Sequence, residues 1–375
     1  MLRVRPVRGR RATNSFLAMA PPLYREDPHW VPPLPVSAKR FMSAKRNPYF
    51  AEAEIDHFLA ERDGVVVGRI STTIDPGYVA RYGKVGFFGW FESVPDPLVA
   101  GALLDTAEAW ARERGMTQLA GPYSYCSTQE FGLLVDGFDT DPAAFQPHNP
   151  PYYRSLLEGA GYAPSFSTET YSWSVDRDRP AMLAAVQRAE QARLAGGFTV
   201  RDLDPKHRDR DLDHAYRLFA ASFADNHDVI AMSRPVFDFQ ARELKDFLDP
   251  RLIRFVELDG RPVGFSMLLA DVNEVLRTAG GRLSPGFLLS YRRLVREIQG
   301  AVVLMIGVLP ELTGAGVGRI LAGEIARVGL GEAGPYRQVH TTWIHEENWQ
   351  SRALVARSGS TPNRRYLVLA KDLLG

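Results

Sequence analysis

Three glycines at alternate positions, Gly314, Gly316 and Gly318, lie between the apolar run 302–308 and a helical pattern that begins near residue 317. A strand that enters a glycine-rich turn and then a helix presents unpaired backbone N–H groups at the positive end of the helix dipole. Glycine also lets the backbone approach a bound group without a Cβ clash. The stretch therefore predicts an anion site for a phosphate or diphosphate. The alternative is a tight strand–helix turn that binds nothing.

The spacing of these glycines does not match two common nucleotide-binding loops. No Gly-Lys-Ser/Thr follows them, which excludes a phosphate loop of the Walker type. The segment before them predicts a β-hairpin rather than a strand–helix–strand unit, so a dinucleotide-binding fold is not indicated.

The elements around the glycines occur twice in the chain. The stretches FLAERDGVVVGRIST and FVELDGRPVGFSML each predict two strands joined by an Asp-Gly turn. Gly64 and Gly260 are 196 positions apart, and so are Gly68 and Gly264. In both halves a central strand, an amphipathic helix, a further strand, a short helix and a final strand follow in the same order.

This repeat predicts an α/β protein of two tandem units, each a mixed, mainly antiparallel sheet flanked by helices. We expect the final strands near 168–175 in the first unit and near 365–370 in the second. The second unit holds an extra helical insert at about 285–299. The predicted domains are 1–178, a helical linker 179–198, and 199–375.

Composition restricts the partners. The 375 residues carry 45 Lys and Arg against 44 Asp and Glu, so neither a DNA nor a membrane partner is expected. No run of 18 apolar residues predicts a membrane-spanning helix. Cys126 is the only cysteine, which excludes an internal disulfide and agrees with a cytoplasmic location. The five arginines of residues 1–11 predict a first strand with outward side chains, or alternatively a nucleic-acid arm.

Two motifs of the second half resemble those of the GNAT acyltransferases. Residues 308–310, VLP, followed by the glycines of 316–318 and a helix, are similar to the family's coenzyme A diphosphate loop. Residues 348–354, NWQSRAL, with Gly359, are similar to its next motif. The resemblance covers 199–375 and implies an acyl-CoA donor.

The chain departs from that family at two positions. Thr313 stands where the loop usually has Gln or Arg, and Val355 stands where a tyrosine usually protonates the leaving thiolate. The first half has no glycine loop. Its segment 91–97 instead carries Glu92 and Asp96, which disfavour an anion. The chain thus resembles a tandem GNAT protein with a degenerate first half. In that half the stretches 30–34 (WVPPL), 47–50 (NPYF), 86–92 (GFFGWFE) and 149–153 (NPPYY) resemble those of a bacterial subgroup of tandem GNAT proteins.

The resemblance implies transfer of an acyl group from a thioester to an amine. A backbone N–H of the central strand must polarise the thioester carbonyl, and amides of the loop must hold the diphosphate. Metal chemistry is not expected, because His340 and His345 have an unsuitable spacing and no cysteine assists them. The expected cofactor-binding residues are Ile306, Gly307, Val308, Thr313, Gly314, Gly316, Val317, Gly318, Arg319 and Asn348.

A base must take the proton of the amine. Asp271 and Asn273 follow the strand beside the central one, and His345 follows the strand that separates from it. Histidine titrates near neutral pH and suits this role. Each candidate has a structural alternative, because Asp and Asn often cap turns and a histidine can be a satisfied core residue.

We expect an acyl-CoA-dependent N-acyltransferase that acts on a small-molecule amine. One alternative is a transferase of the same tandem fold that takes an aminoacyl group from charged tRNA, for which the basic segment 291–296 would start a groove. The other alternative is an acyl-CoA-binding protein without catalysis, which the missing tyrosine favours.

Overall fold

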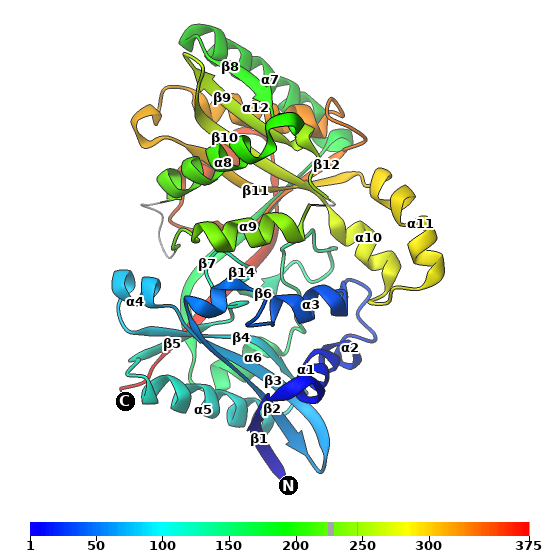
Figure 1. Cartoon of the computed structure of the whole chain (residues 1–375), viewed down its shortest axis with the longest axis vertical. Coiled ribbons are helices and arrows are strands. Elements are labelled where there is room, and N and C mark those ends of the chain that lie inside the picture. Colours follow the sequence, from blue (N-terminus) through cyan, green and yellow to red (C-terminus); the bar gives the residue numbers. More distant parts are fainter. Residues whose placement is uncertain (224–228, 246, 375) are drawn as a thin grey trace. The chain divides into compact units, whose positions relative to one another are not determined.

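The computed structural model describes residues 1–223, 229–245 and 247–374 of the chain. They form two compact units (Figure 1). The first holds 1–168, 229–230 and 364–374, and the second holds 169–223, 231–245 and 247–363. Each contains mainly antiparallel strands flanked by helices, which confirms the predicted fold class.

The first unit has the strand order β1-β2-β3-β4-β5-β14, and β6 pairs with β14. Neighbouring strands are antiparallel except β4 and β5. The arginine-rich N-terminus forms β1, and Arg5 of this strand bonds to Glu61 at 2.5 Å, so the preferred interpretation of that segment is confirmed. The strands are β1 Leu2–Pro6, β2 Glu54–Arg62, β3 Val65–Ile74, β4 Val85–Ser93, β5 Gln118–Gly121, β6 Leu133–Asp136 and the C-terminal part of β14 Thr361–Asp372. The helices are α1 Gly9–Ala18, α2 Ala20–Leu23, α3 Pro35–Phe41, α4 Pro76–Tyr82, α5 Pro97–Glu113 and α6 Tyr153–Gly159.

Side chains of β2 alternate between two cores, as the period of a strand requires. Phe58 and Ala60 join the core beneath α5, where Leu103 is fully buried. Leu59 lies on the opposite face against Phe16 of α1. The first sheet is therefore covered on both faces.

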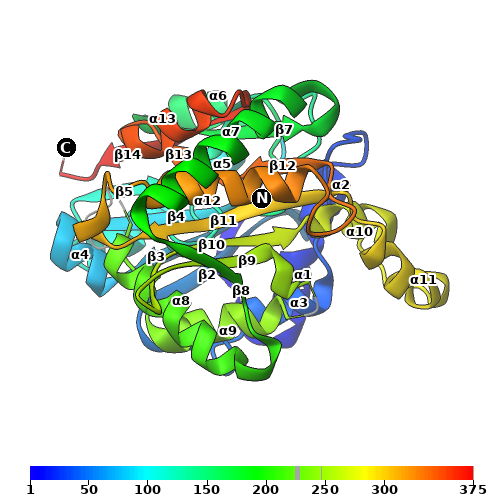
Figure 2. The same cartoon turned by 90° about the horizontal axis from the view of Figure 1, so that it is seen from above.

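The second unit has the strand order β7-β12-β11-β10-β9-β8. Figure 2 shows α7 and α12 on one face of these strands and α8 and α9 on the other. The strands are the C-terminal part of β7 Ala163–Ser174, β8 Thr199–Asp202, β9 Ile253–Leu258, β10 Arg261–Ala270, β11 Gly300–Val308, β12 Gln338–Thr341 and β13 Ile344–His345. The helices are α7 Val175–Gly196, α8 Arg208–Phe223, α9 Arg234–Glu243, α10 Val272–Ala279, α11 Pro285–Arg296, α12 Val317–Gly329 and α13 Trp349–Arg357.

The last strand of each half pairs with strands of the other half. In β7, Trp173 lies opposite Val339 of β12, in the second unit. In β14, Ala370 lies opposite Ala120 of β5, in the first unit. Both units are therefore discontinuous along the chain, whereas the sequence assigned each final strand to its own half.

The predicted linker helix is part of the second unit. It forms α7, which ends at Gly197 in the left-handed conformation. A Cβ built on Gly323 of α12 would lie 2.2 Å from the Cβ of Ala189, so the two helices are in close contact. The small residues at this crossing make that approach possible.

The duplication is confirmed by equivalent glycines. A Cβ on Gly68 would lie 2.7 Å from Leu103 of α5, and a Cβ on Gly264 would lie 2.5 Å from Val317 of α12. Each glycine lets a helix approach its sheet.

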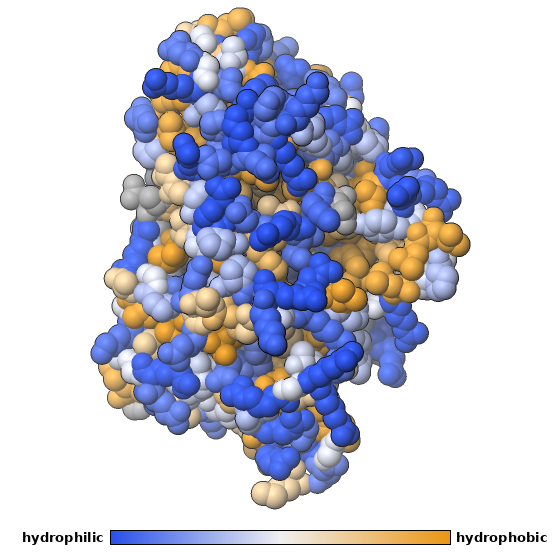
Figure 3. Space-filling view, viewed as in Figure 1, coloured by the Kyte–Doolittle hydropathy of each residue, from blue (hydrophilic) through white to orange (hydrophobic). Residues whose placement is uncertain are grey.

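The second half contains an insertion before its central strand. Gly68 pairs with Ser93, and Gly264 pairs with Val308. Gly68 and Gly264 are 196 positions apart, whereas Ser93 and Val308 are 215 positions apart. The second half therefore contains 19 additional residues, which include α11. Figure 3 shows apolar residues gathered over α10 and α11. Among the described residues, no helix has the length and apolar character needed to span a membrane.

Candidate functional site

The glycine loop opens the N-terminus of α12. Gly314 and Gly316 have φ angles of 88° and 99°, in the region that glycine favours. Gly316 is the N-cap of α12, and no side chain caps it. The N–H of Ile320 donates to the carbonyl oxygen of Gly316 at 3.1 Å and starts the helical ladder. The amides of the three residues between them therefore have no acceptor within the helix.

The space around this terminus suits a bound anion. A Cβ on Gly318 would meet no atom within 4 Å, so the helix surface is open there. A Cβ on Gly316 would lie 3.2 Å from Ala192 and 3.4 Å from a guanidinium nitrogen of Arg319. Arg319 thus folds back toward the loop and adds a full positive charge to that of the helix dipole. The structure brings together the predicted residues Gly314, Gly316, Val317, Gly318 and Arg319.

Thr313 differs from these loop residues. Its N–H donates to the carbonyl oxygen of Pro310 at 3.1 Å, within a short 3-10 turn. Its backbone amide is therefore engaged, and only its exposed side chain could contact a cofactor.

The equivalent helix of the first half has a closed N-terminus. Asp96 is the N-cap of α5 and accepts from the N–H of Leu98 at 2.8 Å. It also accepts from Arg62 at 2.7 Å, and these two hydrogen bonds lower the pKa of the Asp96 carboxyl. The carboxylate of Asp96 thus already neutralises the positive end of the α5 dipole. This carboxylate disfavours the binding of an external anion at the start of α5.

The central strand β11 loses one neighbour midway. It pairs in parallel with β12 from Gly300 to Val303. The pairing ends where the N–H and hydroxyl of Thr342 donate to the carbonyl oxygen of Val303 at 3.2 and 3.3 Å. From Leu304 to Ile306 the side chains are half-buried, whereas those before them are buried. Beyond Val303, the described part of β12 provides β11 with no ladder partner.

A β-bulge lies at this point of β11. Met305 pairs with Met267 of β10 and Val303 pairs with Leu268, so Leu304 is the extra residue. The extra residue of a bulge is left outside the ladder. The sequence predicted contacts from Ile306, Gly307 and Val308 of this strand but not from Leu304. No glycine or proline marks the position.

Asp271 serves as a helix cap. Its carboxylate is 5% exposed and accepts from the N–H of Asn273 at 3.0 Å, at the start of α10. Its own N–H donates to the carbonyl oxygen of Gly300 at 2.8 Å. Gly300 is four residues before Leu304, which corresponds to about 13 Å along a strand. Asp75 caps α4 in the same way, 196 positions earlier, in the half without a glycine loop. Capping therefore accounts for Asp271, and a role of Asp271 or Asn273 as the base stays a prediction.

His345 and Asn348 follow the point where β12 leaves β11. His345 is 8% exposed, and its Nδ1 accepts from the N–H of Glu347 at 3.1 Å. Asn348 caps α13 by accepting from the N–H of Ser351 at 3.0 Å. Their roles as base and cofactor contact stay predictions. Among the described residues, no group of three or more His, Cys, Asp and Glu is placed to hold a metal ion.

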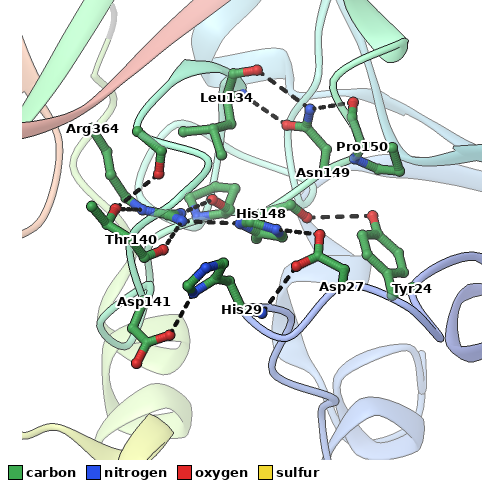
Figure 4. Close-up of polar contacts among 12 residues, drawn as sticks. Tyr24, Asp27, His29, Leu134, Thr140, Asp141, His148, Asn149, Pro150 and Arg364 are labelled. Atoms are coloured by element: carbon green, nitrogen blue, oxygen red, sulfur yellow. Dashed lines mark hydrogen bonds and ion pairs between the residues drawn. The ribbon is translucent and has the colours of Figure 1, made fainter.

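A polar network in the first unit escaped sequence analysis (Figure 4). Arg364 of β14 is 2% exposed and donates to the carbonyl oxygens of Thr140 and Pro147 at 2.6 and 3.1 Å. It also bonds to Nδ1 of His148 at 3.0 Å, and Nε2 of that ring bonds to Asp27 at 2.7 Å. Burial raises the pKa of the Asp27 carboxyl, but hydrogen bonds from His148 and from the backbone outweigh burial and lower it. The network fixes β14 in the first unit.

Glu92 forms a second buried cluster there. It is 8% exposed and accepts from Tyr153 at 2.6 Å, Tyr24 at 3.0 Å and Arg69 at 3.2 Å. Burial raises the pKa of its carboxyl, although Arg69 opposes this. Glu92 thus has a structural set of partners in the half that lacks the loop.

Two curated proteins match nearly the whole chain. The bacterial ceramide synthase of Caulobacter vibrioides is 31% identical and covers 99% of this chain and 98% of its own length. Protein YghO of Escherichia coli is 29% identical and covers 96% and 93%. No protein-family model matches the chain.

The fold occurs in solved structures. A tandem GNAT protein from the clavulanic acid biosynthesis pathway aligns with a TM-score of 0.57 at 15% identity, over 100% of this chain and 99% of its own. The chain therefore belongs to the family of the bacterial ceramide synthase, and it has the fold of tandem GNAT proteins.

Proposed function

We propose that this protein transfers an acyl group from a coenzyme A thioester to an amine. The observation that supports this best is the open N-terminus of α12 with Arg319 beside it, found in only one of the two halves. The amine nitrogen attacks the thioester carbonyl carbon, and the carbon–sulfur bond breaks. The amine loses a proton, coenzyme A leaves as a thiolate that takes one up, and the product is an amide.

The loop holds the donor in this account. The N–H groups of Gly316, Val317, Gly318 and Arg319, with that of Gly314, bind the diphosphate. The guanidinium of Arg319 adds a charge-assisted hydrogen bond. Because a backbone amide already has its direction fixed by the helix, binding requires little rearrangement.

The thioester lies along the part of β11 that β12 has left. The N–H of Leu304, the extra residue of the bulge, polarises the carbonyl as negative charge develops on its oxygen. Ile306, Gly307 and Val308 lie between the bulge and the loop and offer further backbone contacts. Val355 is 5% exposed and has no acidic proton, so the thiolate takes its proton from water.

The acceptor is a long-chain amino alcohol in this proposal. One of the two relatives that cover almost the whole chain is a bacterial ceramide synthase. A ceramide is the amide of a fatty acid with such an amino alcohol, so its formation is N-acyl transfer. This choice narrows the small-molecule amine expected from the sequence.

The test is amide formation by the purified protein. Palmitoyl-CoA and sphinganine serve as probes, with the amide measured by mass spectrometry and the released thiol by a colour reagent. We expect amide and thiol in equal amounts from the wild type, and neither from Gly318→Glu. Thiol release without amide formation, both in assays with sphinganine and in assays with short-chain amines, would contradict acyl transfer to an amine. Equal activity in the variant would contradict the donor site.

A further inference from the structure

The insertion in the second half has an unusual surface. The 19 additional residues lie between α10 and β11 and include α11. The equivalent connection of the first half runs from α4 directly to β4. The repeated fold therefore forms without this segment, and the surface of the segment needs a separate explanation.

Apolar side chains are exposed at the start of the insertion. Leu283, Leu288 and Leu289 have 46%, 59% and 89% of their surface exposed. Ser284 caps α11 by accepting from the N–H of Phe287 at 3.1 Å, and Phe287 is buried. That buried residue fixes which face α11 turns inward, so the leucines remain outside. Leu288 and Leu289 are part of α11, and Figure 3 shows apolar residues gathered over α10 and α11.

Arginines follow the leucines on the same helix. Arg292, Arg293 and Arg296 are exposed, and Arg282 is exposed just before the helix. Residues 282–296 contain four arginines and no acidic residue, so this segment carries +4 while the whole chain carries +1. Glu297 follows directly and forms an ion pair with Arg293 at 3.9 Å. The positive charge is therefore concentrated on the segment that also exposes the leucines.

We propose that residues 282–296 dock on the surface of a membrane that contains anionic lipids. The leucines insert at the boundary between headgroups and acyl chains, and the arginines contact the anionic headgroups. The segment would lie in the interface rather than span the bilayer. This departs from the expectation of no membrane partner, which rested on the lack of a spanning segment and on the net charge of the whole chain.

Two other occupants fit the surface less well. An RNA would use the arginines but not three exposed leucines, because affinity for nucleic acid comes mainly from charge and base stacking. A second copy of this chain would have to bring a negative surface against the arginines, whereas the same segment of a symmetric copy is positive. The combination of apolar and basic residues matches an anionic bilayer.

The test is binding of the full-length protein to vesicles, without any substrate, so its result is independent of the proposed function. Vesicles of phosphatidylcholine with one quarter phosphatidylglycerol are compared with phosphatidylcholine alone by flotation. We expect binding to the anionic vesicles and at least tenfold weaker binding to the neutral ones. Leu288→Asp with Leu289→Asp should weaken binding to the anionic vesicles by at least tenfold.

Matched controls separate this surface from exposed leucines in general. Leu98 and Leu194 are 73% and 67% exposed in other helices, and the pair Leu98→Asp with Leu194→Asp should bind vesicles like the wild type. Circular dichroism checks that all variants are folded. Arg292→Glu with Arg296→Glu should abolish the preference for anionic vesicles.

Three outcomes would overturn the proposal. The first is equal vesicle binding by the wild type and the Leu288 and Leu289 variant. The second is binding of tRNA that competes fully with vesicles and is unaffected by the leucine substitutions. The third is a dimer in solution that the leucine substitutions dissociate, together with no vesicle binding.

Discussion

Asp96 and Gly316 are the N-caps of equivalent helices, and they leave those helix ends in opposite states. The carboxylate of Asp96 bonds to the N–H of Leu98 at 2.8 Å, so α5 carries its own anion. Gly316 provides no side chain, and the first amides of α12 remain available. The loop between the central strand and this helix is also longer in the second half. It spans nine positions from Val308 to Val317, the residue of α12 against Gly264. The equivalent loop of the first half spans six positions, from Ser93 to Val99 of α5. One half of the duplicated fold is thus shaped to receive an anion from outside.

Removing the guanidinium beside the loop should weaken donor binding. Arg319 is exposed, so its contribution is limited by solvent screening to roughly 1 kcal/mol, or about a 5-fold rise in the Kd for acyl-CoA after Arg319→Ala. Titration calorimetry measures this, and 0.5 M salt should reduce the difference. Arg327→Ala, near the other end of α12, is the control and should keep wild-type affinity. An unchanged Kd for Arg319→Ala would show that the amides act without this side chain.

The bulge of β11 makes a backbone prediction testable. Proline at a bulge removes an N–H without breaking a ladder bond, so Leu304→Pro should fold. If that amide polarises the thioester carbonyl, kcat should fall by about 100-fold while acyl-CoA still binds. Val302→Pro lies within the ladder and should disrupt folding instead. Wild-type kcat in folded Leu304→Pro would rule out this amide.

The buried arginine of the final strand should be essential for stability. Arg364→Met leaves the carbonyl oxygens of Thr140 and Pro147 without this donor, so we expect a loss of at least about 2 kcal/mol in the free energy of unfolding. The neighbouring Arg365 is exposed, and Arg365→Met should change stability by less than about 0.5 kcal/mol. Urea denaturation compares the two. Equal stability of both variants would contradict the anchoring role of the network.

A buried histidine should make stability fall in mild acid. His57 is 8% exposed among Phe16, Phe50 and Tyr125, and burial lowers its pKa to about 4. An unfolded chain binds a proton at this residue below about pH 6.5, while the folded chain does so only near pH 4. The unfolded state therefore takes up this proton first, so the free energy of unfolding falls as the pH drops from 6.5 toward 4. The loss is about 2 kcal/mol by pH 5.

The variant His57→Gln should lack this part of the acid dependence. The urea concentrations at half-unfolding of the wild type and the variant should approach each other as the pH is lowered from 7.5 to 5. His214→Gln, at a position of α8 that is not buried, is the control for the loss of one imidazole. Parallel profiles for the wild type and His57→Gln would contradict the prediction.

The repeat could be predicted from the sequence because it depends on local signals. The Asp-Gly turns and the glycines that admit a helix, Gly68 and Gly264, keep a constant spacing of 196. The loop was also visible, since the positive φ angles of Gly314 and Gly316 require glycine.

The exchange of the final strands could not be predicted. A strand reports which of its faces is buried but not which partner it will join, and β7 and β14 have the same kind of pattern. The partner is set by contacts far away in sequence, such as those of Arg364 with Thr140. The bulge at Leu304 was invisible for a similar reason, because it is defined only by the register with β10.

The candidate bases show a further limit. Asp271 was selected for its position after a strand, and the structure gives it the cap that Asp75 also forms. A sequence cannot distinguish a carboxylate that caps a helix from one that also takes a proton, since the same residue at the same place serves both.

The most direct measurement is titration of the protein with an acyl-CoA, in the wild type and in Gly318→Glu. A Cβ at Gly318 meets no atom within 4 Å, and the added carboxylate lies where α12 tolerates it, so the variant should fold. The same change in the first half, Gly101→Glu, also enters open space and is the matched control. The account predicts one binding site per chain in the wild type and in Gly101→Glu, and at least a tenfold loss of affinity in Gly318→Glu. Two sites per chain, or undiminished binding in folded Gly318→Glu, would contradict the claim that α12 alone receives the donor.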